Sequence, residues 1–89
     1  MRIDMSGAEI ADLRARLEAS DDAEATGDNE YVADCYDADN PLSVELAFEE
    51  GGIEVLACEE LAYDEAMDGW YLSGPVTDAS VIRAALLAL

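Results

Sequence analysis

The segment Leu42–Leu61, LSVELAFEEGGIEVLACEEL, decides the fold of this chain. In its first half, apolar residues alternate with small or acidic ones, which is the period-2 pattern of a half-buried strand: Leu42, Val44, Leu46 and Phe48. A similar alternation follows Gly51-Gly52, with Ile53, Val55 and Ala57 at every second position. A Gly-Gly loop or a Glu-Glu-Gly-Gly loop would join these strands into a hairpin. Either register places both apolar sets on one face, which we expect to lie in the core.

The opposite face of this hairpin carries acidic residues. Glu45, Glu49 and Glu54 fall at the alternate positions, and the tighter register sets Glu49 directly across from Glu54. Like charges that face each other across two strands destabilise a sheet. The fold must therefore tolerate these carboxylates or use them.

Composition places the chain among small acidic globular proteins. Its 89 residues predict a single domain, 1–89, and the 52% hydrophobic content argues against a disordered acidic tail. The net charge is −18, because 22 acidic residues face four arginines, with no lysine and no histidine. Such a surface repels nucleic acid and anionic membranes and attracts basic proteins.

The charge is unevenly distributed along the sequence. Between residues 17 and 82 there are 19 acidic residues and no basic one. Met1 is not followed by an apolar signal region, and no segment has the length of a transmembrane helix. Two cysteines, Cys35 and Cys58, are too few for a disulfide scaffold and suit a reducing compartment. We therefore expect a cytoplasmic location.

A helix is predicted at each end of the chain. The first spans Gly7–Ala19, where Ser6 and Glu9 form a capping-box pattern. The second begins after Thr77 or Asp78 and is apolar nearly all round. A helix of that kind is buried on two sides or covered by a partner, so a homodimer through the C-terminal helix is one expectation.

Further strands are predicted beside the central hairpin. Residues 31–36 and 70–72 read as strands, whereas 59–68 is compatible with a continued strand, a loop or a short helix. We predict an α+β fold of order α-β-β-β-β-α, an antiparallel sheet of three to four strands with both helices packed on one face. The nine expected core residues are Leu13, Leu17, Val44, Leu46, Phe48, Ile53, Val55, Ile82 and Leu86.

Catalytic and metal-binding patterns are missing from the sequence. Without histidine there is no Ser-His or Cys-His pair, and no Gly-rich phosphate loop occurs. The segment Asp37–Asn40 resembles a calcium loop at first, but Pro41, Leu42 and Phe48 occupy positions that an EF-hand reserves for an oxygen ligand, Gly and Glu. We expect no enzyme activity, no metal and no cofactor.

Two explanations of the acidity stay open. In the first, the chain is a non-enzymatic cytoplasmic domain of a salt-adapted organism, a small protein-interaction module whose carboxylates serve solvation. In the second, carboxylates replace nucleic-acid phosphates. Same-face residues of a β-strand recur at about 6.5–6.8 Å, and DNA advances about 3.4 Å per phosphate on each strand, so alternate acidic positions can follow a row of phosphates. Salt adaptation should acidify every exposed surface, whereas here the helices are nearly neutral, which favours mimicry.

By its size and by the carboxylates between Ser20 and Asp68, the chain resembles the small acidic DNA-mimic proteins of phages, such as anti-CRISPR and anti-restriction proteins. The resemblance implies an inhibitor in the host cytoplasm that occupies the DNA- or RNA-binding groove of a defence complex or another DNA-binding complex. Its partner would be a basic nucleic-acid-binding protein or ribonucleoprotein. The carboxylates expected to contact the partner are Asp34, Asp37, Asp39, Glu45, Glu49, Glu50, Glu54, Glu59, Glu60, Asp64, Glu65 and Asp68. Asp34, Asp37 and Asp39 are expected to extend the row of Glu45, Glu49 and Glu54 along the neighbouring strand and turn. A second cluster is expected to consist of Glu59, Glu60, Asp64, Glu65 and Asp68.

Overall fold

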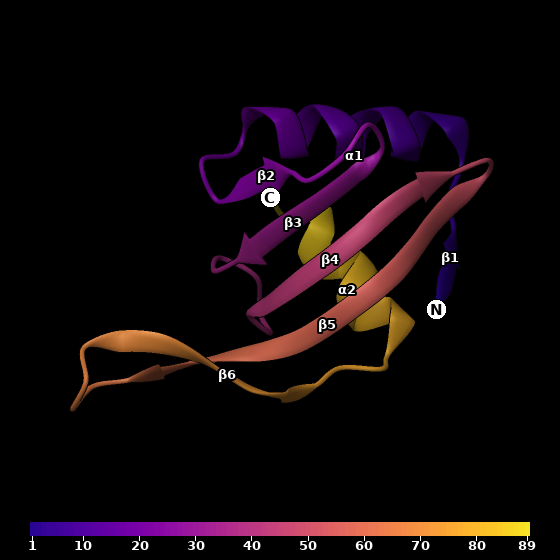
Figure 1. Ribbon diagram of the computed structural model, residues 1–89. Coiled ribbons are helices and arrows are strands. Elements are labelled where there is room, and N and C mark those ends of the chain that lie inside the picture. The colour runs from indigo at the N-terminus through magenta and orange to yellow at the C-terminus, as the bar shows by residue number, and fades with distance from the viewer.

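The computed structural model describes all 89 residues, and it contains six strands and two helices. In chain order the elements are β1 (Arg2–Asp4), α1 (Gly7–Ala19), β2 (Ala23–Ala25), β3 (Glu30–Cys35), β4 (Leu42–Glu49), β5 (Gly52–Asp64), β6 (Gly69–Pro75) and α2 (Ala79–Leu86). All strand pairs are antiparallel (Figure 1). The predicted α+β class and the helices near both ends are confirmed.

The strand order is β1-β5-β4-β3-β2, and β6 pairs with β5 as well. Because β4 occupies one edge of β5, β1 and β6 share the other edge, at opposite ends of this 13-residue strand. The last β4 pair joins Leu42 to Glu60, so from Leu61 onward β5 pairs only with β6. The resulting hairpin extends past the rest of the sheet (Figure 1). We call its residues Leu61–Leu72 the arm.

The predicted number of strands was wrong. Two of the six strands, β1 and β2, contain three residues each, which is too short for an alternating pattern to be visible. Both form by pairing with an existing strand, β5 and β3 respectively. Residues 59–68, which the sequence left open, continue β5 as far as Asp64 and then turn into β6.

The central hairpin closes through Glu50 and Gly51. Phe48 pairs with Ile53 and Glu49 with Gly52, so the pairing is that of the longer predicted loop, and the Gly-Gly loop was wrong. Gly51 has a φ of +76°, a left-handed conformation that favours glycine. At Gly52 a Cβ atom would lie 2.3 Å from the carbonyl oxygen of Ile3, so the approach of β1 requires glycine there.

A β-bulge changes the predicted inward face of β5. Glu45 pairs with Ala57 but Leu46 pairs with Val55, which leaves Leu56 as the extra residue. Beyond the bulge the alternation is inverted, so Cys58 is buried and Ala57 is exposed. The prediction that Ala57 faces the core was wrong for this reason.

One apolar cluster of 17 buried residues forms the core, and it contains all nine predicted core residues. Leu13 and Leu17 of α1 and Ile82 and Leu86 of α2 join the buried side chains of β3, β4 and β5 in this cluster. Both caps form: Ser6 and Glu9 make the capping box, and Asp78 caps α2 through the N–H groups of Ser80 and Val81.

Candidate functional site

The sheet face that points away from the apolar core is strongly acidic. The buried residues of β4 are its even-numbered ones, so its odd-numbered residues face outward, and strand pairing extends this alternation to the neighbouring strands. We call this surface the open face. It carries eight carboxylates from five strands: Asp4, Glu24, Glu30, Asp34, Glu45, Glu49, Glu54 and Glu59.

Glu45 lies at the centre of this surface. Its direct cross-strand partners are uncharged, Val32 on β3 and Ala57 on β5. Its four diagonal neighbours, which pair with Ser43 or Ala47, are all carboxylates: Glu30, Asp34, Glu54 and Glu59. Diagonal positions lie about 7–8 Å apart, so the charges are dense without directly opposing one another. The predicted opposition of Glu49 and Glu54 was wrong, since Glu54 pairs with Ala47.

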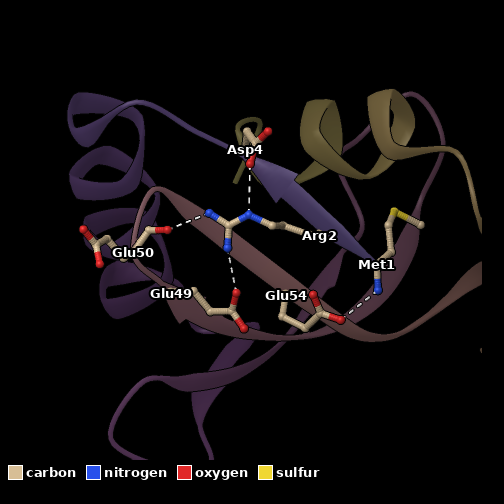
Figure 2. Close-up of polar contacts among 6 residues, drawn as sticks. All are labelled: Met1, Arg2, Asp4, Glu49, Glu50 and Glu54. Carbon is tan, nitrogen blue, oxygen red and sulfur yellow. Dashed lines mark hydrogen bonds and ion pairs between the residues drawn. The ribbon is translucent and has the colours of Figure 1, made fainter.

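Two of the predicted site residues are neutralised by the N-terminus of the same chain (Figure 2). Arg2 donates from Nη1 to Glu49 Oε2 at 2.7 Å and from Nε to Asp4 Oδ1 at 3.0 Å. The α-amino group of Met1 donates to Glu54 Oε1 at 3.0 Å. The hydrogen bond to Asp4, with Glu49 nearby, raises the pKa of Arg2.

The other arginines are engaged away from the centre of the open face. Arg16 pairs with Asp12 and Arg83 with Glu9, both on α1, while the Arg14 guanidinium lies 4.3 Å from the centre of the Phe48 ring. Glu45 and its diagonal neighbours Asp34 and Glu59 have no cationic partner. The open face is thus partly neutralised at the β1 end of β5 and uncompensated toward the arm.

Several predicted site residues lie elsewhere. Asp37 and Asp39, in the β3–β4 turn, line a pocket with Ser80 and Ala84 of α2. Glu60 pairs with the core residue Leu42 and is therefore on the side of the sheet opposite the open face, although it is exposed. Asp37 and Asp39 therefore do not extend the row of Glu45 and Asp34 along the neighbouring strand and turn, as the sequence predicted.

The remaining predicted residues are in turns. Glu50 is in the β4–β5 turn, and its carbonyl oxygen accepts a hydrogen bond from Arg2. Asp64 organises the tip of the arm by accepting from the N–H of Ala66 at 2.9 Å. Asp68 has a φ of 48° and accepts a hydrogen bond from the Tyr63 hydroxyl, which raises the pKa of Tyr63. Glu65 is exposed in the same turn, so the predicted second cluster of Glu59, Glu60, Asp64, Glu65 and Asp68 is spread over both faces and the tip.

The predicted site residues did not include Asp4, Glu24 or Glu30, and the packing of Trp70 against Tyr36 and Tyr63 was not predicted. Glu24 and Glu30 were excluded because residues 20–29 read as a loop and the strand was expected to start at 31. Trp70 lies 5.0 Å from Tyr36 and 5.5 Å from Tyr63, measured between ring centroids. A shallow groove lined by Glu45, Glu59 and Leu72, among others, connects the centre of the open face to the arm.

The chain has no significant match to any protein-family model, curated protein or solved structure with which it was compared. Neither helix has the length and hydropathy needed to cross a membrane. No group of three or more His, Cys, Asp or Glu side chains is arranged to hold a metal ion. The case for a function therefore rests on the open face itself.

Proposed function

We propose that this protein is an inhibitor that places its open face in the nucleic-acid-binding groove of a basic protein or ribonucleoprotein. The target class is a host defence complex of the CRISPR or restriction type, or another DNA-binding complex, in the host cytoplasm. The observation that supports this most directly is the arrangement of Glu45 with four diagonal carboxylates, of which Glu30, Asp34 and Glu59 have no cationic partner.

The physical argument concerns spacing and charge. Diagonal neighbours lie about 7–8 Å apart, and carboxylates of one strand, such as Glu30 and Asp34, lie four residues or about 13 Å apart. Together they form a two-dimensional array of anions that can stand in for the phosphates of a nucleic acid. Arginine and lysine side chains that line a nucleic-acid groove would meet carboxylates through charge-assisted hydrogen bonds. Long-range attraction between the opposite charges speeds the encounter. Because salt screens this attraction, binding should weaken as the salt concentration rises. No cofactor takes part in this mode of action.

A homodimer through α2 is compatible with this proposal. The buried residues of α2 belong to the core cluster, on the side opposite the open face. A second copy bound to the outer side of α2 would therefore leave Glu45 and its neighbours accessible. Light scattering at moderate salt tests the dimer separately from inhibition.

The proposal is tested by capture and competition. Immobilised protein is incubated with host lysate, and bound proteins are challenged with duplex DNA. A triple variant, Asp34→Asn, Glu45→Gln and Glu59→Gln, should lose capture. The control variant, Asp12→Asn, Glu18→Gln and Asp28→Asn, removes three carboxylates that are not among those of the open-face strands and should retain it. Glu49 and Glu54 are left intact because they hold Arg2 and the N-terminus. A captured partner that binds DNA and this protein simultaneously would falsify mimicry.

Salt adaptation makes the opposite prediction about folding. A domain whose acidity serves solvation at high salt should fold only when mutual repulsion is screened. Circular dichroism between about 0.1 M and 1 M salt, over which the Debye length falls from about 10 to 3 Å, discriminates the two. We expect full folding at the lower concentration, because the carboxylates around Glu45 alternate with uncharged residues.

A further inference from the structure

The arm exposes an unusual concentration of large apolar side chains. Of the seven large hydrophobic residues that are exposed, five lie on the arm: Tyr63, Met67, Trp70, Tyr71 and Leu72. β4 ends before this part of β5, so no strand besides β6 pairs with the arm. Large apolar side chains exposed together on one segment of a small protein are typical of a contact site.

Part of this surface continues the open face. The pairs Leu61–Leu72 and Tyr63–Trp70 extend the outward positions of β5 beyond Glu59. Tyr36, just after β3, contacts Trp70 from the side, with 5.0 Å between the ring centroids. We call Tyr36, Tyr63, Trp70 and Leu72 the aromatic patch. The groove lined by Glu45, Glu59 and Leu72 links the aromatic patch to the acidic centre.

The negative charge around the aromatic patch favours a cationic binding partner. The hydroxyls of its two tyrosines lie against carboxylates: Tyr36 donates to Asp34 at 3.5 Å and Tyr63 donates to Asp68. No cation lies between residues 17 and 82. A second copy of the arm would bring like charges together, whereas a cationic segment would gain from both the rings and the carboxylates.

Among cationic side chains, arginine fits best. Its planar guanidinium stacks on aromatic rings and binds carboxylates through two parallel hydrogen bonds, whereas lysine is a more strongly hydrated point charge. The chain uses the same contact internally, where the Arg14 guanidinium lies 4.3 Å from the centroid of Phe48. We propose that the aromatic patch binds an arginine-rich segment of the partner, anchoring it next to the acidic centre. This inference rests on the proposed function, since it names the chemistry of the same partner.

Trp70 provides the measurement, because it is the only tryptophan of the chain. Nona-arginine and nona-lysine peptides, which carry equal charge, are titrated into the protein while Trp70 fluorescence and the anisotropy of a labelled peptide are recorded. We expect nona-arginine to bind about tenfold more tightly, which corresponds to about 1.4 kcal/mol, and to change the Trp70 emission.

Substitutions test whether the preference for nona-arginine depends on the aromatic patch. Trp70→Leu and, separately, Tyr63→Leu should reduce the preference for arginine to about twofold or less by anisotropy. Tyr71→Leu is the matched control, because Tyr71 is similarly exposed, 49% against 44% for Trp70, but alternates to the other face of β6. Thermal unfolding monitored by circular dichroism confirms that each variant is folded.

The outcomes separate this inference from the proposed function. Equal affinity for the two peptides, or equal effects of Trp70→Leu and Tyr71→Leu, would overturn the aromatic patch as an arginine site, while loss of capture in the Asp34, Glu45 and Glu59 variant would still support mimicry. If neither peptide binds, both proposals fail. Concentration-dependent self-association that Trp70→Leu abolishes would identify a second copy as the occupant and would also overturn the inference.

Discussion

Arg2 and Glu49 form an ion pair of 2.7 Å, although their strands, β1 and β4, are not neighbours in the sheet. The strand between them is β5, where Gly52 pairs with Asp4 on one side and with Glu49 on the other. The Arg2 guanidinium reaches across β5 to the carboxylate, and a Cβ atom at the adjacent Gly51 would lie 3.3 Å from its Nη2. The N-terminal strand thereby neutralises one end of an otherwise acidic face.

Gly52→Ala should detach β1. The added Cβ would lie 2.3 Å from the Ile3 carbonyl oxygen and 3.2 Å from the Asp4 Cα, and both are backbone atoms that move only if the strand moves. We expect a loss of stability of about 2 kcal/mol or more. The amide of Val55, which donates to the Met1 carbonyl, should exchange faster with solvent.

Gly7→Ala is the matched control for this substitution. No atom lies within 4 Å of the position where its Cβ would be, and Gly7 is the first residue of α1. Alanine there should leave stability unchanged or raise it slightly. Unchanged exchange at Val55 in Gly52→Ala would contradict the proposed role of the glycine.

Arg2→Met should make stability more dependent on salt. The variant removes the cation that Asp4 and Glu49 share, so their charges add to the repulsion on the open face. We expect a lower urea midpoint at low ionic strength and a difference that shrinks at about 1 M salt, where screening is nearly complete. Arg14→Met is the control: it removes the same charge, but Arg14 contacts Asn29 and the Phe48 ring rather than a carboxylate.

Phe48→Ala should cost about 3–5 kcal/mol, the range of large-to-small changes in a core. The Phe48 ring lies edge-on to Tyr31, with 5.7 Å between centroids, and beneath the Arg14 guanidinium. Urea denaturation measures the change, and Tyr71→Ala on the exposed arm serves as the comparison. A neutral result at Phe48 would contradict its assignment to the core.

High pH should destabilise the protein through its two buried thiols. Burial raises the pKa of Cys35 to about 12 and that of Cys58 to about 11, whereas an unfolded thiol titrates at about 8.5. The unfolded state therefore loses these protons first, so stability is unaffected below about pH 8 and falls as the pH rises toward 11 or 12. Urea midpoints at about pH 8 and pH 9.5 should differ, and less so in Cys35→Ala.

Thiol reactivity provides an independent check of the same feature. In the native protein at neutral pH both cysteines should react slowly with a disulfide reagent, since the thiolate is the reactive form and both residues are buried. Unfolding in urea should expose both. Rapid modification under native conditions would show that the raised pKa values do not describe the folded protein.

Local sequence patterns were sufficient to predict the central hairpin, both helices and nine residues of the core. These features depend on local patterns: alternation in Leu42–Phe48, the capping box of Ser6 and Glu9, and the helical spacing of Ile82 and Leu86. Each pattern extends over enough residues for the burial of apolar side chains to select one secondary structure. The alternation in the hairpin also indicated that its outer face is acidic, because residues between core positions must point outward.

The grouping of the charges depends on contacts between segments that are distant in the sequence. The bulge at Leu56 inverts the faces of β5, and so brings Glu59 rather than Glu60 to the open face. The short strands β1 and β2 carry Arg2 and Glu24 to that face, but three residues are too few to signal a strand before a neighbour supplies hydrogen bonds. Which carboxylates are neutralised and which stay free is set by pairing between distant segments, and local sequence patterns do not encode that register.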